Sequence, residues 1–165
     1  GVCQRPDRGC FGEYDGEWYL LSSSTTKAGA NTNRDININI ASSYINGKIL
    51  QPNEKFSFWD TVGKCTYDKG YKDATVYNNG KKTKGIGGGV CQVSTTVNMA
   101  VKSAGIKTNA RQHSLPVSYA SREDEATVSF GNTDFKFTNT TGKTIMLVMG
   151  SVDGSCTCEV WAKYE

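Results

Sequence analysis

The chain has 165 residues, of which 37% are apolar and 21% are charged, and its formal net charge is +3. This length and composition predict one buried core in a single domain, and the small basic excess lacks the dense Lys and Arg surface of a nucleic-acid-binding protein. No apolar run has membrane-spanning length, so we expect no membrane contact by this segment itself, although an anchor could have been removed from it.

The first thirty residues show little periodicity. Residues 1–20 form a polar lead-in that contains two cysteines, and the folded domain is expected to span residues 21–165. The Ser- and Thr-rich run 22–26, which is followed by Gly29 and Asn31, is typical of a loop.

The next segment, residues 34–45, fits two patterns. Ile36, Ile38 and Ile40 alternate as in a strand, whereas Ile36, Ile40 and Tyr44 lie along one face of a helix. Polar residues that can cap a helix precede this segment, and an Asn-Gly pair follows it. These flanking signals favour the helix.

Two short strand-like runs follow, the aromatic run 56–59 and residues 74–77. Asn79-Gly80 is a hairpin-type turn signal, and the lysines within residues 81–84 are expected in a solvated turn. The second helix is clearer, because apolar residues recur at helical spacing from Val93 to Ala104.

Beyond residue 106 the pattern changes to short β-type runs separated by turn residues. These runs predict strands at 115–119, 126–130, 134–137, 144–149 and 159–164. Helices first and antiparallel strands afterwards predict an α+β fold, with two helices packed on a mainly antiparallel sheet.

Six cysteines are many for a protein of the reducing cytosol. Two lie near each end of the chain: Cys3, Cys10, Cys156 and Cys158. In an oxidising compartment we expect disulfides between the two ends, because a Cys-x-Cys pair bonds to itself only with strain. The alternative is a zinc site formed by the same four thiolates, although their spacing differs from that of common zinc modules.

A glycine run brings Cys91, one of the two remaining cysteines, to the start of the second helix. The N–H groups at a helix start lack intrahelical partners, and the helix dipole is positive there. Both effects favour the thiolate, which is the form that attacks carbonyl groups. The glycines also allow positive φ angles and a close approach of substrate to the main chain. The pattern therefore predicts a nucleophilic cysteine.

Cysteine catalysis also needs a base and donors for the developing oxyanion. His113 is the only histidine, and it lies in the junction between the second helix and the next predicted strand. From this junction the imidazole could reach the N-terminal end of the helix. The oxyanion donors are expected from Gly88, Gly89 and the N–H groups of Cys91 and Gln92, whose side-chain amide could also donate.

A third group could orient the imidazole, and Glu125, Asp124 and Asp134 are the candidates. The spacing of these carboxylates does not choose among them. Ser94 is a further candidate for contact near the nucleophile, and Arg111 is a candidate for binding a substrate carboxylate. This chemistry requires no metal and no organic cofactor.

The motif around the cysteine resembles the VanW-like domain family of bacteria. The matching segments are Gly87–Thr96, Phe56-Ser57-Phe58, Gly70-Tyr71, His113–Tyr119 and Asp134–Asn139. The resemblance runs from about residue 21 to residue 149, and it implies that Cys91 and His113 occupy the family's catalytic positions. It also implies an extracellular protein at the cell surface of a Gram-positive bacterium. Where the family commonly has Asp-Ala-Thr-Val, this chain has Glu125, and the four terminal cysteines are not part of the family pattern.

Clostridial members of this family are associated with L,D-transpeptidase activity on peptidoglycan. The resemblance therefore implies that Cys91 attacks the third residue of a tetrapeptide stem and that a second stem resolves the thioester into a 3→3 cross-link. The expected partners are peptidoglycan stem peptides. The alternatives are resolution by water, which makes a cysteine peptidase or carboxypeptidase, a non-catalytic module that binds peptidoglycan or glycopeptides, and a disulfide between Cys91 and Cys65.

Overall fold

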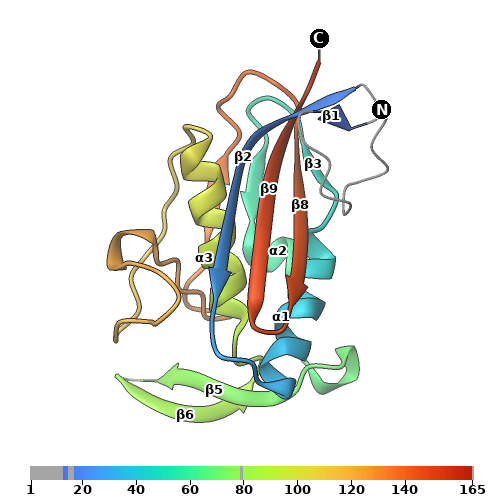
Figure 1. The fold of residues 1–165 in the computed structure, drawn as a ribbon. Coiled ribbons are helices and arrows are strands. Elements are labelled where there is room, and N and C mark those ends of the chain that lie inside the picture. Colours follow the sequence, from blue (N-terminus) through green and yellow to red (C-terminus); the bar gives the residue numbers. More distant parts are fainter. Residues whose placement is uncertain (1–12, 15–16, 79, 165) are drawn as a thin grey trace.

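A computed structural model describes residues 13–14, 17–78 and 80–164. Its centre is an antiparallel sheet with the strand order β1-β2-β9-β8-β3 (Figure 1). These strands are β1 (Glu13–Tyr14), β2 (Trp18–Lys27), β3 (Lys48–Leu50), β8 (Ile145–Val152) and β9 (Ser155–Lys163). Two long helices, α1 (Thr32–Ile45) and α3 (Val90–Ser103), pack on one face of the sheet. The predicted α+β class is confirmed.

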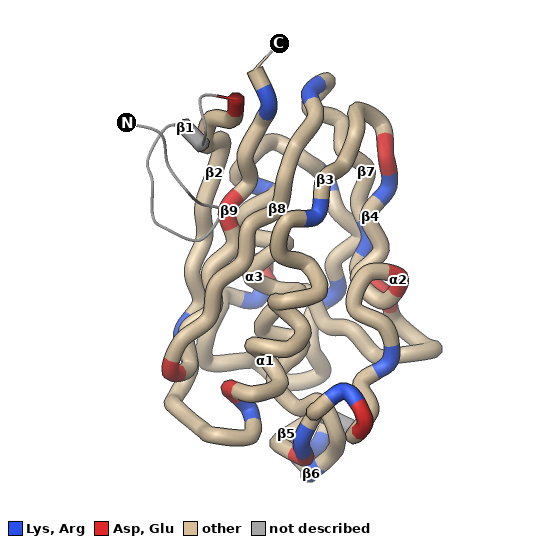
Figure 2. Tube along the Cα trace, turned by 90° about the vertical axis from the view of Figure 1, so that its right-hand side faces the viewer, with Lys and Arg blue, Asp and Glu red and all other residues tan. Residues whose placement is uncertain are grey.

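Short elements join this sheet to the two long helices. They are β4 (Lys55–Ser57), which pairs with β7 (Lys136–Thr138), the hairpin of β5 (Asp73–Asn78) and β6 (Lys81–Ile86), the helix α2 (Phe58–Val62), and the 3₁₀ turns η1 (Tyr67–Lys69) and η2 (Arg122–Asp124). The β5–β6 hairpin extends below the sheet, and the chain turns from β6 directly into α3 (Figure 1). Lys and Arg are interspersed with Asp and Glu along the chain trace (Figure 2). None of the helices in the described part is long and apolar enough to span a membrane.

The main core lies between the sheet and the two long helices. Fully buried contributors include Ile38, Ala41, Ile45, Val93, Val97, Val101, Leu147, Val160 and Ala162. The other face of the sheet carries a second apolar cluster, formed by Trp18, Met146, Val148 and Trp161. Since successive side chains of a strand point to opposite faces, both faces of β8 and β9 are buried. This explains the unbroken apolar run 145–149.

The prediction of a loop at residues 22–26 is wrong, because these residues lie in the middle of β2. This strand pairs with β9 from Trp18 to Lys27 and so includes the last residues of the expected lead-in. Its polar side chains bond to α3: Ser22 Oγ donates to the Ala100 carbonyl at 2.6 Å, and the hydroxyls of Thr26 and Thr96 lie 2.7 Å apart. These partners are distant in sequence, so the local composition concealed the strand.

Both long helices are confirmed. The first begins at Thr32, and the Asn31 side chain accepts a hydrogen bond from the Arg34 N–H at 3.0 Å, which is a typical N-cap. The strand expected at 56–59 is only partly formed. It ends at Ser57, whose hydroxyl caps the short helix α2 by accepting from the Asp60 N–H at 3.1 Å.

The remaining strand and turn predictions, from residue 74 onwards, are partly confirmed. The runs 144–149 and 159–164 correspond to β8 and β9, the run 134–137 is shortened to β7, and 74–77 lies in β5. The lysines of 81–84 lie in β6 and not in a turn. The strands expected at 115–119 and 126–130 are wrong, because both runs are irregular apart from an isolated bridge between Ser129 and Thr133.

The predicted disulfides between the chain ends are not found, because Cys156 and Cys158 are free thiols. Both side chains lie in the core between the sheet and the helices, and Cys156 Sγ lies 3.8 Å from Ser42 Oγ. Their proposed partners, Cys3 and Cys10, lie outside the described residues. The described residues also contain no cluster of His, Cys, Asp and Glu that could hold a metal ion.

Candidate active site

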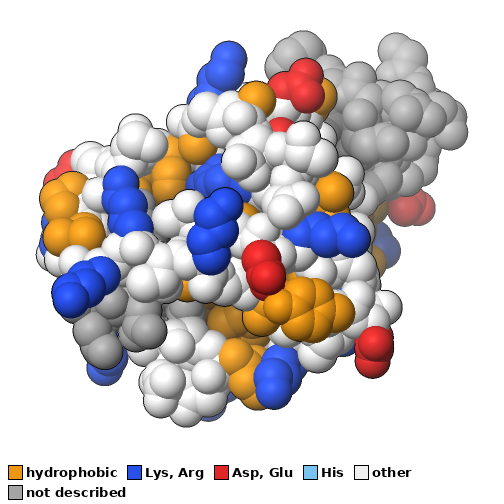
Figure 3. Space-filling view, turned by 90° about the horizontal axis from the view of Figure 1, so that it is seen from below, with side chains coloured by type: hydrophobic (Ala, Val, Ile, Leu, Met, Phe, Trp, Pro, Cys, Tyr) orange, Lys and Arg blue, Asp and Glu red, His pale blue; other side chains and the backbone are white. Residues whose placement is uncertain are grey.

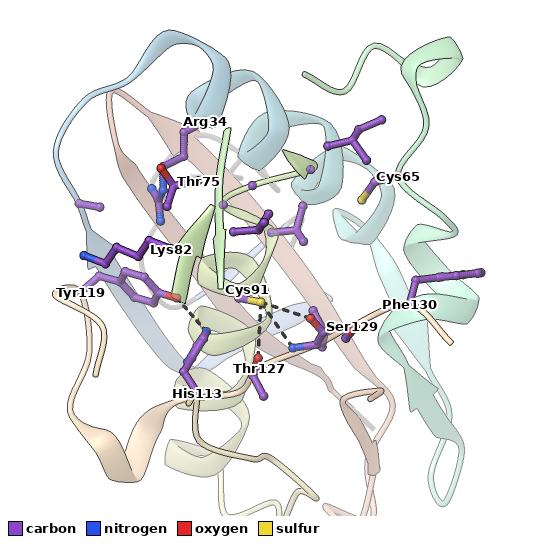
Figure 4. Close-up of a pocket in the computed structure, with 18 of the residues that line it drawn as sticks. Arg34, Cys65, Thr75, Lys82, Cys91, His113, Tyr119, Thr127, Ser129 and Phe130 are labelled. Carbon is purple, nitrogen blue, oxygen red and sulfur yellow. Dashed lines mark hydrogen bonds between the residues drawn. The ribbon is translucent and has the colours of Figure 1, made fainter. Parts of the chain in front are cut away.

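A cleft of about 620 Å³ opens beside the N-terminal end of α3. Its walls come from the glycine loop 87–89, the β5–β6 hairpin, the first turn of α1 and parts of the irregular segment 113–130 (Figure 4). Cys91 lies near the centre of these lining residues. The fold therefore exposes the start of α3 to a ligand-sized space.

The glycine loop has the backbone conformation that its sequence predicts. Gly87 and Gly89 have φ angles of +81° and +108°, which residues other than glycine rarely adopt. A Cβ atom on Gly88 would lie 2.5 Å from the Thr75 carbonyl oxygen, and one on Gly89 would lie 2.8 Å from Arg34 Cγ. The loop thus packs directly against β5 and α1, and this contact fixes where α3 begins.

Gly88→Ala is expected to lower the free energy of unfolding by about 1–3 kcal/mol, because the new methyl group overlaps the backbone of β5. Urea unfolding of the two proteins measures this difference. Gly150→Ala is the matched control, since nothing lies within 4 Å of the added Cβ and the residue is exposed in β8. Equal destabilisation by both substitutions would contradict a tight contact at Gly88.

The Cys91 side chain is half-buried against the backbone of residues 127–128. Its Sγ atom lies 3.5 Å from the Val128 N–H nitrogen, 3.4 Å from the Val128 carbonyl oxygen and 3.8 Å from Thr127 Oγ1 (Figure 4). A side-chain hydrogen bond also links Cys91 to His113. The structure therefore brings the predicted nucleophile and the only histidine into direct contact.

Glu125 holds the His113 imidazole in place. Its Oε1 atom lies 2.9 Å from His113 Nδ1 and accepts the His113 backbone N–H at 2.7 Å. Arg122 Nη1 lies 3.3 Å from the same oxygen, and Tyr119 Oη lies 3.5 Å from His113 Nε2. Glu125 and His113 are only 2% and 3% exposed, so their contact is protected from solvent.

Of the three carboxylates considered as the orienting group, only Glu125 contacts the imidazole. Asp124 lies 3.2 Å from Lys102 Nζ, at the end of the turn η2. Asp134 bonds to Ser57 Oγ and accepts the Trp59 N–H at 3.0 Å, so it supports the start of α2. The environment, and not the spacing in sequence, distinguishes these acidic residues.

The Cys91–His113 contact changes the pKa of both groups. Burial opposes ionisation of Cys91, but the hydrogen bond and positive charge of His113, with hydrogen bonds from Val128 and Thr127, lower the thiol pKa overall. Burial also opposes the charged form of His113, yet the hydrogen bonds and negative charges of Cys91 and Glu125 raise its pKa. Both shifts favour a thiolate–imidazolium pair.

Alkylation by iodoacetamide is expected to select Cys91 over Cys65 at mildly acidic pH. Burial raises the pKa of Cys65 despite a hydrogen bond from Tyr71 and the charge of Lys69, whereas the pKa of Cys91 is lowered. Because a lowered pKa preserves the thiolate as the pH falls, half-maximal alkylation of Cys91 should occur below the ordinary thiol value of about 8.5. Peptide mapping across pH 5–9 measures both rates, and equal labelling at pH 6 would contradict the assignment.

Two candidates beside the nucleophile point away from the cleft. Gln92 is fully buried, and its amide nitrogen donates to Thr26 Oγ1 at 3.0 Å and to the Gly154 carbonyl at 3.1 Å. Ser94 donates to the Ala126 carbonyl at 2.5 Å and so ties the irregular segment to α3. Both side chains hold the structure around the cleft together.

The oxyanion donors also differ from the expectation. The Gln92 N–H donates to the Gly89 carbonyl at 3.0 Å, so it is already engaged. The N–H groups of Gly88, Gly89 and Cys91 donate to no other group in the described part of the chain. These amides, at the positive end of the α3 dipole, are the donors that the structure offers to an oxyanion.

The predicted carboxylate contact, Arg111, is exposed and does not line the cleft. The cleft is instead lined by Arg34 and Lys64, which sequence reasoning missed, and by Lys82, which was expected in a solvated turn. No local signal identified them, because α1, the segment after α2 and the hairpin converge only in the folded chain.

The comparisons with known proteins agree with the sequence motifs. The family described as VanW like protein matches residues 33–161. The uncharacterized protein YoaR of Bacillus subtilis (strain 168) is 39% identical over 127 residues, which cover 76% of this chain and 42% of YoaR. The vancomycin B-type resistance protein VanW of Enterococcus faecalis is 30% identical over 142 residues, which cover 81% of this chain and 46% of that protein.

The chain spans less than half the length of these two relatives. No solved structure matches it. The family match covers most of the chain, and it includes the glycine loop, the cysteine, the histidine and the glutamate that meet in the cleft. The chain belongs to the VanW-like protein family.

Proposed function

We propose that this chain is a cysteine-dependent L,D-transpeptidase that acts on peptidoglycan stem peptides. The observation that carries the proposal is that His113 interacts with both Cys91 and Glu125, so that a thiol, a base and an orienting carboxylate meet beside a cleft. A nucleophile held against a base that a third group orients is the arrangement used by enzymes that form covalent acyl intermediates.

In the first step the Cys91 thiolate attacks the carbonyl carbon of the third stem residue, and a C–S bond forms. The N–H groups of Gly89 and Cys91 stabilise the negative charge that develops on the carbonyl oxygen. The C–N bond to the terminal D-alanine then breaks. The imidazolium of His113 donates its proton to the leaving amine, and a thioester on Cys91 remains.

In the second step the side-chain amine of another stem attacks the thioester carbon. Neutral His113 accepts the proton that this amine loses, and the C–S bond breaks to release the Cys91 thiolate. The product is an amide between the third residues of two stems, and the enzyme returns to its starting charge state. Glu125 keeps the imidazole oriented through both proton transfers.

The relatives support a role in the cell wall. The relative from Enterococcus faecalis is named a vancomycin B-type resistance protein, and the other relative comes from Bacillus subtilis. We therefore place the proposed activity outside the cell membrane, at the wall of a Gram-positive bacterium. The protein supplies the nucleophile and the acid–base group, and the stems supply the acyl group and the amine. The proposed reaction therefore uses no cofactor.

Incubation with purified disaccharide–tetrapeptide muropeptides tests the proposal, and mass spectrometry identifies the products. Transfer gives a dimer whose mass is that of two muropeptides less one D-alanine, whereas hydrolysis gives the tripeptide and free D-alanine. Cys91→Ala is expected to give neither product. Hydrolysis that depends on Cys91 and gives no dimers would show that the chain is a carboxypeptidase and not a transpeptidase. Full cross-linking by Cys91→Ala would contradict the proposal.

A further inference from the structure

The cleft beside Cys91 is lined by basic residues without acidic ones. Arg34, Lys64 and Lys82 contribute to its lining, and no Asp or Glu of the described residues does. Arg34, Lys82 and Tyr119 lie on one side of Cys91, whereas Phe130 lies on the other (Figure 4). Figure 3, which views the molecule from its hairpin end, shows Lys and Arg bordering exposed apolar side chains. An anionic group is therefore the complementary ligand for the Arg34 side of the cleft.

Arg34 is the cation in this group that has a buried donor atom with no acceptor among the described residues. It forms no ion pair with a described carboxylate, and its Nη1 atom is buried without a hydrogen-bond partner. Its guanidinium instead lies 5.6 Å from the centre of the Tyr119 ring. A buried donor without an acceptor is costly, and a planar guanidinium matches the two oxygens of a carboxylate. The structure thus leaves an acceptor to be supplied by a ligand.

The position of Arg34 determines which carboxylate this is. Its side chain packs against Gly89, where an added Cβ would lie 2.8 Å from Arg34 Cγ, and Gly89 is two residues before Cys91. When the last peptide bond of a chain is attacked, the terminal carboxylate is only three covalent bonds from the attacked carbon. A cation beside the nucleophile can therefore reach that carboxylate.

We propose that Arg34 binds the α-carboxylate of the C-terminal residue that leaves, and so restricts attack to the last peptide bond of the donor. This specificity role rests on the proposed function, because it concerns the donor peptide of that reaction. A donor whose terminal carboxylate is amidated loses the pairing with Arg34, and a longer donor moves its carboxylate away from the site.

Binding to the Cys91→Ala protein tests the proposal without turnover. Isothermal titration compares a tetrapeptide stem that ends in free D-alanine with the same stem as its C-terminal amide. The acid is expected to bind about tenfold tighter or more, which is the usual value of a charge-assisted hydrogen bond. Adding Arg34→Gln to the Cys91→Ala protein should make the affinities for the acid and the amide similar. Arg34→Lys should retain part of the preference for the acid. Arg111→Gln, which changes an exposed arginine outside the cleft, should leave the ratio unaltered.

Equal binding of the acid and the amide, or an unchanged preference in a folded Arg34→Gln protein, would overturn the proposal. Circular dichroism of each variant establishes that it is folded. Turnover of the same two peptides by the protein with Cys91 intact separates this result from the proposed function. Equal turnover of the acid and the amide would contradict only the role of Arg34. Binding that depends on Arg34 without any turnover would contradict the transpeptidase activity but support the carboxylate site.

Discussion

Replacement of His113 by asparagine is expected to slow acylation of Cys91 by about 10²- to 10⁴-fold, the usual contribution of a positioned acid–base group. The substitution removes the positive charge and the hydrogen bond that lower the thiol pKa, while burial, which raises that pKa, remains. The thiolate fraction at neutral pH therefore falls, and the leaving amine loses its proton donor. Single-turnover kinetics with a tetrapeptide stem measures the acylation rate.

The pH dependence of alkylation separates the two causes of this loss. In the parent protein the Cys91 thiolate persists below the ordinary thiol pKa, whereas in His113→Asn the midpoint of alkylation should move to higher pH. Ser114→Ala, which changes the exposed neighbour of His113, is the control and should leave both properties unaltered. An unshifted midpoint in His113→Asn would show that the imidazole does not ionise the thiol.

Replacement of Glu125 by glutamine is the second substitution with a large expected effect, a loss of about 10²-fold or more in acylation rate. Glutamine keeps the shape of the side chain but removes the negative charge that helps to raise the pKa of His113. The pKa of the imidazole should fall and that of the thiol should rise, so less of the protein carries the reactive ion pair. Glu125→Asp keeps the charge on a shorter side chain, and it should retain more activity than Glu125→Gln.

The pKa of His113 can be measured by NMR without ambiguity, because this is the only histidine in the chain and no other imidazole contributes signals. The pKa of His113 in the folded protein lies above the ordinary histidine value. The charged imidazole therefore makes its full contribution to stability at pH values below the ordinary pKa. This contribution is lost as the pH rises through the raised pKa. A His113 pKa that is the same in the parent and in Glu125→Gln would exclude Glu125 as the orienting group.

The contact between Cys91 and His113 was predictable because the signals of these two residues are local or unique. The glycine loop and Cys91 are adjacent in the sequence, and the chain offers only one histidine. The choice of Glu125 over Asp124 and Asp134 was not predictable. It depends on which carboxylate the irregular segment turns inward, and that is decided by contacts with α3.

Those contacts use polar residues on the buried part of α3. Thr95 Oγ1 accepts the Ala126 N–H at 3.0 Å, and the Asn98 amide donates to the Asp124 carbonyl at 2.9 Å. Both side chains are fully buried, because they satisfy the backbone groups of a segment that has no sheet partner. Sequence periodicity reports the apolar face of a helix but not which loop its polar face supports, so the strands expected at 115–119 and 126–130 were wrong.

Arg34 and β2 were missed for a related reason. Arg34 lies in the first turn of α1, far from Cys91 in the sequence, and only packing of α1 against Gly89 brings its side chain to the cleft. The Ser- and Thr-rich run of β2 has loop-like composition, yet pairing with β9 makes it a strand of the main sheet. Long-range pairing overrode local propensity in β2, and long-range packing placed Arg34.

The acyl-enzyme is the most direct test of the account. Intact-protein mass spectrometry after brief mixing with a tetrapeptide stem, at limiting acceptor, should show an added mass equal to the stem less D-alanine. Peptide mapping should place that mass on Cys91, and hydroxylamine should remove it as expected for a thioester. Release of D-alanine with no adduct on Cys91 in the parent protein, and at the same rate in Cys91→Ala, would contradict it.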